Sequence, residues 1–271
     1  MNNKNNTDDT LKKRIESYAN HISYNDKIHF EFTKLTNTIP ELKKHRDWVE
    51  TNKWGFGDRA FHYMWFLILK DLSESFSSGK ALEIGVFKGQ VISLWELISN
   101  LIGWKLQISA ISPFEGNMSK NRWVHFFKKT FHTNYREDYK IGNLHFQEDY
   151  MKLNRIIFDE FNLDFNSIEI IKGYSNDPKV VDKVKGVSTS YSLIYIDGDH
   201  SYENVLCDIK NYSTLIHAKG FLVMDDASYF LPGSVFFKGF ESVSRACEIL
   251  PDLGFLNVLN IGHNRIYQRI P

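Results

Sequence analysis

Short apolar runs alternate with amphipathic helical segments from about residue 80 to residue 250. Parallel strands need crossover connections that pack back onto the sheet as helices, so this alternation predicts a parallel sheet with helices on both faces. The last two apolar runs, FLNVLNI and NRIYQRI, have only Gly262 and His263 between them and must pair antiparallel. We therefore expect an α/β fold with a mostly parallel seven-stranded sheet that ends in an antiparallel hairpin.

The chain before these strands has a different character. Residues 1 to about 10 are rich in asparagine and charge, a composition that is typical of disorder, and the pattern from there to residue 72 is helical. We predict an N-terminal helical extension over residues 1–72 and a second domain over residues 73–271. A long insertion over residues 113–165 follows the second strand at the edge where ligands bind. We expect it to border the ligand, with the rings of Trp123, Tyr135 and Tyr139 able to stack on a ligand face.

Charge and apolar windows limit the partners and the compartment. Lys and Arg number 33, as do Asp and Glu, so no global positive field would draw the protein onto nucleic acid or an anionic membrane. We therefore expect neither nucleic acid nor a membrane as a partner, whereas the sequence is compatible with a homo-oligomer. The N-terminus lacks the apolar segment of a signal peptide, and no window is long enough for a membrane span. The sequence therefore predicts a cytoplasmic protein.

Chemically active side chains gather where the apolar runs stop. In doubly wound sheets, ligands bind outside the carboxyl ends of the strands, so these positions are the candidate site. The first run ends in a glycine turn before a helix, where free backbone N–H groups can meet a ligand. The five strand ends are, in order, Glu83 with Gly85 and Gly89; Ser112 with Glu115; Tyr174 with Ser175; Asp197, Asp199 and His200; and Asp225 with Asp226.

Three carboxylates, Asp197, Asp225 and Asp226, converge at the ends of two neighbouring strands. Carboxylates beside a buried strand are costly unless a cation compensates them, and like charges raise one another's pKa. Oxygen-rich clusters of this kind suit Mg²⁺ or Mn²⁺ better than zinc. We do not count Asp199 as a ligand, because it can cap the next helix or support the glycine turn.

Two segments, LEIGVFKG and IYIDGDHSYENVLCDIKNYSTLIHAKGFLVMDD, resemble the class I S-adenosylmethionine-dependent methyltransferases, in the branch with EIGxxxG and IDGDHxY motifs. The resemblance spans about residues 80–271 and implies a Rossmann-like fold that binds S-adenosylmethionine. It implies that the cofactor contacts Glu83, Gly85, Gly89, Ser175 and Asp197. An acidic residue usually holds the ribose at the end of the second strand, but this chain has Ser112 there. Either Glu115 reaches back to the ribose or the ribose is held differently.

The acidic strand ends are similar to those of divalent-metal-dependent O-methyltransferases of the catechol and caffeoyl-coenzyme A type. This resemblance implies that Asp197, Asp225 and Asp226 bind the metal. His200 stands where those enzymes have a lysine base, and Asp226 replaces the usual asparagine. We expect His200, with Asp197, to form the catalytic pair, because a histidine can take a proton near neutral pH and a metal lowers the pKa of a bound hydroxyl.

The sequence therefore predicts an S-adenosylmethionine-dependent O-methyltransferase with divalent metal assistance. Enzymes that resemble this branch commonly act on sugars of natural products or surface polysaccharides, so a sugar hydroxyl is the expected acceptor. One alternative acceptor is a phenolic or other small-molecule hydroxyl. Another alternative is an NAD-linked oxidoreductase, although the turn has fewer glycines than the dinucleotide motif G-x-G-x-x-G requires. A non-catalytic scaffold is the third, and the charge cluster argues against it.

Overall fold

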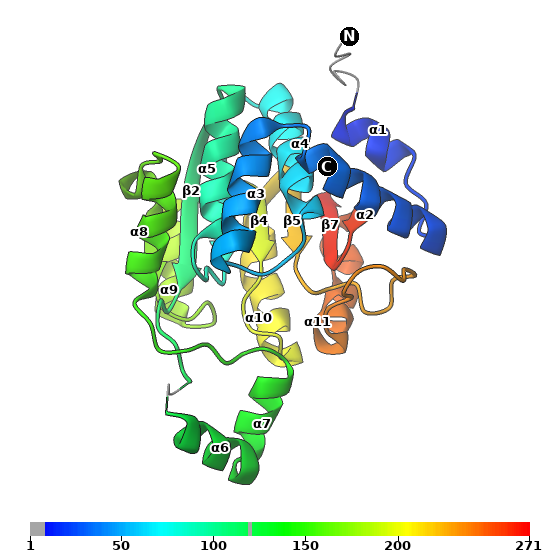
Figure 1. Cartoon of the computed structure of the whole chain (residues 1–271). Helices are drawn as coiled ribbons and strands as arrows, with labels where there is room; N and C mark the ends of the chain where they lie inside the picture. Colours follow the sequence, from blue (N-terminus) through cyan, green and yellow to red (C-terminus); the bar gives the residue numbers. More distant parts are fainter. Residues whose placement is uncertain (1–8, 119–120) are drawn as a thin grey trace.

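The computed structural model describes residues 9–118 and 121–271. Its centre is a seven-stranded sheet with the order β3-β2-β1-β4-β5-β7-β6 (Figure 1). Strands β1 to β5 run parallel, and β7 lies antiparallel between β5 and β6, so the predicted sheet with its terminal hairpin is confirmed. The strands are β1 (Ser78–Ile84), β2 (Lys105–Ser112), β3 (Glu169–Lys172), β4 (Tyr191–Ile196), β5 (Ile216–Met224), β6 (Phe255–Ile261) and β7 (Asn264–Arg269).

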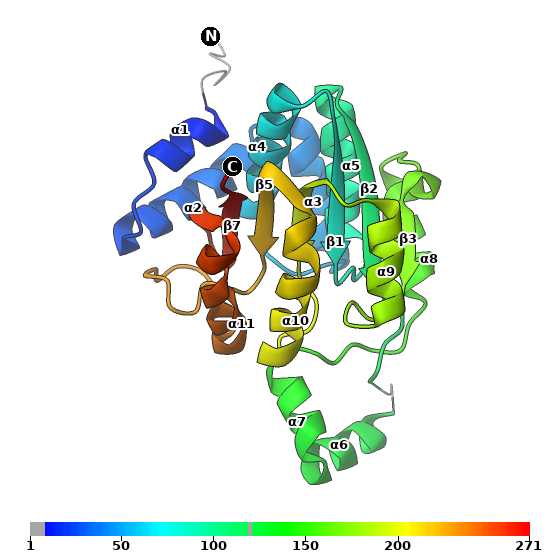
Figure 2. The same cartoon turned by 180° about the vertical axis from the view of Figure 1, so that it is seen from behind.

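Helices cover both faces of this sheet (Figure 2). Helices α1 to α5 and α8 pack on one face, and α9 to α11 pack on the other. The α-helices are α1 (Leu11–Glu16), α2 (Ile22–Thr36), α3 (Pro40–Asn52), α4 (Ala60–Ser75), α5 (Gln90–Ile102), α6 (Arg122–Phe131), α7 (Thr133–Lys140), α8 (Tyr150–Glu160), α9 (Pro178–Val187), α10 (Tyr202–Tyr212) and α11 (Glu241–Ala246). Single 3₁₀ turns lie at Phe165–Ser167, Ser213–Leu215, Cys247–Ile249 and Pro251–Leu253.

Strand β4 shows how the sequence builds the two cores. Successive side chains of a strand point to opposite faces, so Leu193 and Tyr195 belong to one apolar cluster and Ile194 and Ile196 to the other. All six residues of β4 are buried. Because both faces are covered, the carboxyl edge of the sheet is where polar groups can meet a ligand.

The N-terminal helices share the core of one sheet face. The prediction of disorder concerns mainly residues 1–8, which lie outside the described residues. Asp9 is fixed in place, since its carboxylate accepts hydrogen bonds from Arg14 (2.7 Å) and from the hydroxyl of Tyr63 (2.8 Å). The division into an extension over residues 1–72 and a domain over residues 73–271 stays a prediction.

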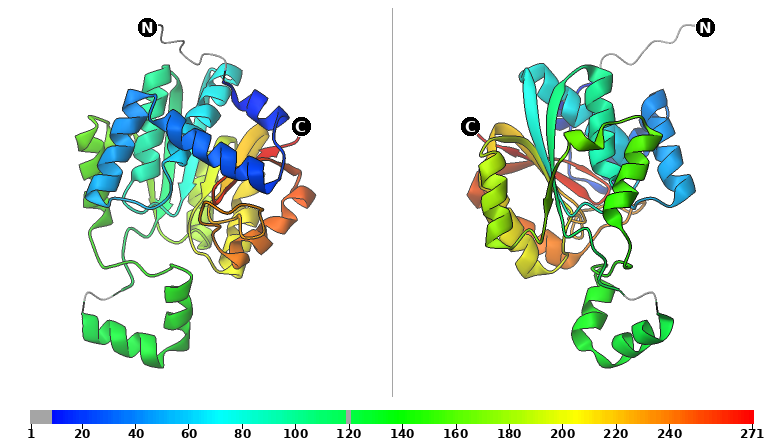
Figure 3. Two further views of the ribbon diagram at one scale, coloured as in Figure 1. Left: turned by 45° about the vertical axis from the view of Figure 1, so that its right-hand side comes forward. Right: turned by 90° about the vertical axis from the view of Figure 1, so that its left-hand side faces the viewer.

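Residues 122–140 form an arm of two helices, α6 and α7, that projects from the carboxyl edge of the sheet (Figure 3). The sequence predicted a helix in the insertion only over about residues 150–161, which is α8. The arm was missed although α6 carries an apolar stripe with helical spacing, because no core was expected beside it, and its two helices indeed bury none of their residues. Among the described residues, no helix is long and apolar enough to cross a membrane.

Candidate active site

Gly85 lies where the turn after β1 crosses the turn after β4. Its φ is +100°, and a Cβ built on it would lie 1.8 Å from the backbone oxygen of Asp197. Only glycine fits this crossing, because both the conformation and the space exclude a side chain. Gly89 also has a positive φ, but a Cβ there would meet Asn154 of α8 at 2.6 Å. Gly89 therefore serves helix packing, and within the described residues it lines neither of the cavities described below.

The first cavity lies over the carboxyl ends of β1 to β4 and contains most of the residues predicted to bind the cofactor. Its lining includes Gly85, Ser112, Glu115, Ser175 and Asp197. The hydroxyl of Ser112 accepts a hydrogen bond from the backbone N–H of Phe114 (3.1 Å). The carboxylate of Glu115 accepts a bond from Lys172 Nζ at 2.6 Å. Glu115 therefore reaches toward β3 rather than back to β2, although it still borders this cavity.

The second cavity, of about 480 Å³, continues the first toward the N-terminal helices. Gly85, Phe87, His145, Asp197 and Gly198 line both cavities, which makes them one cleft. Its walls carry aromatic rings from the loop before α4, from α4 and from the segment after β5, and these are Phe56, Phe61, Trp65, Phe237 and Phe240. Its polar groups include Glu83, His200, Asp225, Asp226 and His263.

Glu83 lies at the inner wall of this cleft and is 3% exposed. Its Oε2 atom is buried and has no hydrogen-bond partner within the described part of the chain. Burial, together with the charge of Asp225, raises the pKa of Glu83 to about 8, against a hydrogen bond from the backbone of Ile92. At neutral pH the side chain is therefore mostly protonated, and a cationic ligand group beside it would favour the ionised form.

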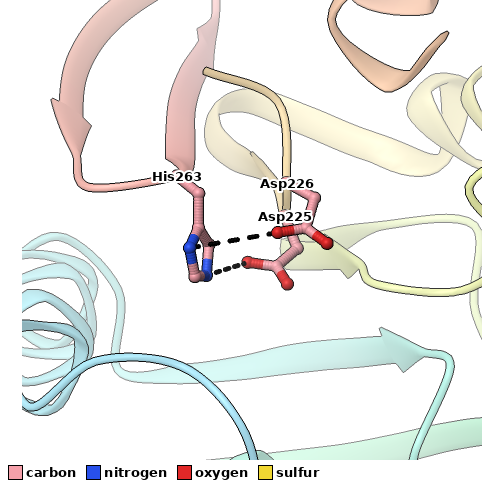
Figure 4. Close-up of side chains that lie close together, drawn as sticks. All are labelled: Asp225, Asp226 and His263. Atoms are coloured by element: carbon pink, nitrogen blue, oxygen red, sulfur yellow. Dashed lines mark ion pairs between the residues drawn. The ribbon is translucent and has the colours of Figure 1, made fainter. Parts of the chain in front are cut away.

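The acidic pair after β5 forms a compact group with a histidine that the sequence analysis did not assign to the site (Figure 4). One ligand atom each from Asp225, Asp226 and His263 lie within 4.8 Å of one another. His263 Nε2 is 3.3 Å from Asp225 Oδ1, and His263 Nδ1 is 3.9 Å from Asp226 Oδ1. The backbone oxygen of His263 also accepts a hydrogen bond from Ala227 N–H (2.9 Å), which ties the hairpin turn to the end of β5.

The charges of this group are strongly linked. Burial opposes ionisation of Asp225, but the charge of His263 outweighs burial and lowers the pKa of Asp225 to about 2. Burial likewise opposes the charged form of His263, yet the two aspartates raise its pKa to about 9. Burial and the charge of Asp225 raise the pKa of Asp226 to about 6. An ion pair between Asp225 and His263 is therefore the main charged contact when no other cation is present.

Asp197 lies against this group without belonging to it. The geometry puts His263, rather than the predicted Asp197, in the set of three clustered ligand atoms. The hydroxyl of Tyr195 donates to Asp197 Oδ2 (3.4 Å). Burial and the charges of Asp225 and Asp226 hold the pKa of Asp197 well above its ordinary value, which disfavours the ionised form. Asp199 accepts a hydrogen bond from Ser201 N–H (2.6 Å), in agreement with a capping role.

His200 is held by the segment that follows the arm. Its Nδ1 bonds to the backbone oxygen of Ile141, and its backbone N–H donates to Asn143 Oδ1 (3.0 Å). A carbonyl oxygen can only accept, so Nδ1 carries a proton, and in the neutral ring the lone pair is then on Nε2. Nε2 lies 3.3 Å from Asp226 Oδ2, and the ring stacks on Phe240. This tautomer leaves His200 Nε2 able to accept a proton inside the cleft.

The insertion contributes to the cleft, but not through the residues that the sequence suggested. Gly142, Asn143 and His145 line it, whereas Trp123, Tyr135 and Tyr139 belong to the arm and are absent from the lining of both cavities in the described structure. The structure thus does not bring these three aromatic residues to the cleft, and their stacking on a sugar stays a prediction. Asn143 and His145 were missed because they follow no predicted strand.

The group of Asp225, Asp226 and His263 fits a divalent cation. Within the described residues, His263 Nδ1 is buried and has no hydrogen-bond partner, and Asp225 Oδ1 is buried with only the ion-pair contact of 3.3 Å to His263 Nε2. Buried polar atoms without partners are costly, and a cation would satisfy those that carry a lone pair. Two carboxylates favour Mg²⁺ or Mn²⁺, and an imidazole nitrogen favours Mn²⁺ over Mg²⁺.

Residues 130–232 match a family described as rhamnosyl O-methyltransferase/CmcI. This segment contains Asp197, His200, Asp225 and Asp226. A curated relative, the uncharacterized protein R132 of Acanthamoeba polyphaga mimivirus, is 26% identical over 184 residues, which cover 66% of this chain and 64% of the relative. The match thus spans slightly less than two thirds of that protein.

Several solved structures share the fold at low sequence identity. The calicheamicin methyltransferase CalS11 has a TM-score of 0.55 and 12% identity, over 89% of this chain and 91% of its own. The O-methyltransferase NovP has a TM-score of 0.53 and 14% identity, over 78% and 79%. An O-methyltransferase from Bacillus cereus in complex with SAH has a TM-score of 0.52 and 10% identity, over 86% and 91%. The predicted resemblance to class I methyltransferases is confirmed by the family match and by the fold.

Proposed function

We propose that this chain transfers the methyl group of S-adenosylmethionine to a hydroxyl group of a sugar-containing small molecule. The observation that carries the proposal is the single cleft in which Gly85, His200 and the group of Asp225, Asp226 and His263 meet. The match of residues 130–232 to a rhamnosyl O-methyltransferase family supports it. The SAH bound in the Bacillus cereus structure, the demethylated form of this cofactor, supports the choice of methyl donor.

In this mechanism the first cavity holds the cofactor, and Gly85 lets its methionine part approach the backbone. The acceptor hydroxyl enters the second cavity and lies against His200. Its oxygen forms a bond to the methyl carbon while the bond from that carbon to sulfur breaks, and the hydroxyl proton passes to His200 Nε2. Asp226 Oδ2, 3.3 Å from Nε2, stabilises the imidazolium that results.

Asp225, Asp226 and His263 would hold the divalent cation, with Asp197 as the further predicted ligand. When bound, such a cation lowers the pKa of a hydroxyl that it contacts. With or without the cation, His200 is the proton acceptor, because it lines the cleft. Hydrogen bonds from its backbone N–H and from its Nδ1 hold the residue in place.

The sugar acceptor is supported by the family description and by the lining of the second cavity. Aromatic rings beside carboxylates and histidines suit a sugar, whose faces are apolar and whose edge carries hydroxyls. A phenolic acceptor would use the same rings, and it remains the second candidate. The antiparallel β7 disfavours an NAD-linked oxidoreductase, whose sheet has the order 3-2-1-4-5-6. We also propose a cytoplasmic location. A homo-oligomer is compatible with this function.

Calorimetric titration with S-adenosylmethionine and with NAD tests the proposal first. We expect saturable binding of S-adenosylmethionine and none of NAD. Transfer of a labelled methyl group to a panel of rhamnosides and matched phenols then tests the acceptor. Binding of NAD alone would overturn the methyltransferase assignment, and methylation of the phenols alone would overturn the sugar.

A further inference from the structure

Helix α6 of the arm is strongly amphipathic, but its apolar face is exposed and does not pack on α7. At 100° per residue, one side carries Phe126, Trp123, Phe127, Phe131 and Val124, and the other carries His125 and Lys129. The polar side is the one that packs on α7. His125 Nδ1 lies 2.8 Å from the hydroxyl of Tyr135, and Lys129 Nζ lies 3.7 Å from the ring centre of Tyr139.

This apolar face is exposed. Trp123 is 73% exposed and Phe131 is 72% exposed, while Phe126 and Phe127 are each more than half exposed. These residues belong to neither apolar core. A helical hairpin in water normally turns its apolar faces inward, so this arm has the reverse arrangement. Exposed apolar surface of this size marks a place of contact with a partner or a membrane.

The charges around this face indicate what covers it. Arg122 and Lys128 lie at the two borders of the apolar stripe, where long cationic side chains can reach polar headgroups. Residues 121–142 contain five Lys or Arg and two Asp or Glu, although the whole chain has formal charge zero. Large aromatic residues on one face and cations on the other are the composition of helices that lie in the surface of an anionic membrane.

We propose that the arm docks on an anionic lipid surface, with the aromatic face of α6 inserted among the headgroups. The expectation of no membrane partner rested on the net charge of the chain, which conceals this local excess. A second copy is a poorer fit. The four aromatic side chains expose roughly 500 Å² in all, below the ~800 Å² per partner of a standard interface, and two cationic arms would repel each other. Because Gly142 and His145 follow the arm and line the cleft, docking would bring the cleft toward the lipid.

Tryptophan fluorescence tests this directly, because Trp123 is the exposed one among the six tryptophans, which all lie in the described residues. Vesicles of phosphatidylcholine with 30% phosphatidylglycerol are added to the full chain at low ionic strength. We expect a blue shift of the tryptophan emission and co-sedimentation of the protein with these vesicles. The amount of protein that sediments should fall at least tenfold with pure phosphatidylcholine vesicles or in high salt. The Trp123→Phe variant should still sediment but lose the shift.

Two double variants complete the test. Phe127→Ser with Phe131→Ser should lower vesicle binding at least tenfold. Ile22→Ser with Phe30→Ser, which removes two exposed apolar side chains from α2, should leave it unchanged. If both double variants sediment with vesicles as well as the unchanged protein does, the proposal is overturned. It is also overturned if the unchanged protein does not bind vesicles and is instead a dimer in solution that the Phe127→Ser, Phe131→Ser variant converts to a monomer. Vesicle binding needs no methyl transfer, so this result is independent of the proposed activity.

Discussion

His263 Nε2 lies 3.3 Å from Asp225 Oδ1, although α11 and β6 lie between these two residues in the sequence. The antiparallel placement of β7 beside β5 causes the contact. Met224, the last residue of β5, is paired with Arg265 of β7, so the turn before β7 must lie next to the two residues that follow β5. The hairpin thus brings a histidine to an acidic strand end.

This contact leads to the first prediction, on metal binding. Asp225→Asn and Asp226→Asn should each weaken binding of Mn²⁺ by about 10-fold or more, because each removes one anionic ligand. His263→Ala should have a similar effect if its nitrogen is a ligand. Titration calorimetry or the electron paramagnetic resonance of free Mn²⁺ measures this without turnover. Asp58→Asn is the matched control, since Asp58 lines the same cleft but contacts His29. Equal Mn²⁺ affinity in all four variants would remove the group as a metal site.

His200→Ala should separate proton transfer from metal binding. We expect turnover to fall by about 10²-fold or more, with S-adenosylmethionine and Mn²⁺ affinities nearly unchanged, as for loss of a general base. His217→Ala is the control, because His217 lies at the opposite end of β5, where it contacts Ser192. Steady-state kinetics and cofactor titration are the measurements. A fully active His200→Ala variant would show that another group takes the proton.

The sequence predicted the parts of this site that follow from strand ends, and missed those that depend on pairing and on the insertion. Asp197, His200, Asp225 and Asp226 follow buried runs, so their convergence was predictable. His263 could have been found from the hairpin alone, because its antiparallel pairing places the turn at the carboxyl edge. The ribose contact could not be predicted, since Glu115 pairs with Lys172 across a loop whose path the sequence does not fix.

Gly85→Ala should destabilise the protein as well as abolish cofactor binding. The added Cβ would collide with the backbone of Asp197, so we expect a loss of about 3 kcal/mol or more in the free energy of unfolding. Gly103→Ala is the matched control. Gly103 has a φ of +69° with nothing within 4 Å of the added Cβ, so its cost should be about 1 kcal/mol, from backbone strain alone. Urea unfolding measures both, and equal losses would show that the crossing can relax.

Cofactor binding should release a proton from Glu83. Its pKa of about 8 leaves it mostly protonated at pH 7 in the free protein, and a nearby cofactor cation would favour ionisation. Titration calorimetry in buffers of different ionisation enthalpy should give about one proton released at pH 7. Glu83→Gln should abolish the release, and Glu96→Gln, in a half-buried residue of α5 outside the cleft, should keep it. Binding without proton release in the unchanged protein would place the cofactor cation away from Glu83.

Asp208 should make the protein less stable as pH rises from about 4 to about 7. Burial raises the pKa of this α10 carboxyl from 3.8 to about 7, against a hydrogen bond from Ser175 that favours ionisation. Below pH 4 the group is protonated in both states, and above pH 7 it is ionised in both. Between these values only the unfolded chain loses the proton, so the folded state loses roughly 4 kcal/mol relative to it.

Asp208→Asn carries no proton to lose, so its stability relative to the unchanged protein should improve steadily across this window and then level off. Asp182→Asn, in an exposed residue of α9, should show no such trend. Urea unfolding at half-unit pH steps measures the difference, and a constant difference between Asp208→Asn and the unchanged protein from pH 4 to pH 7 would show that Asp208 is ionised in the fold.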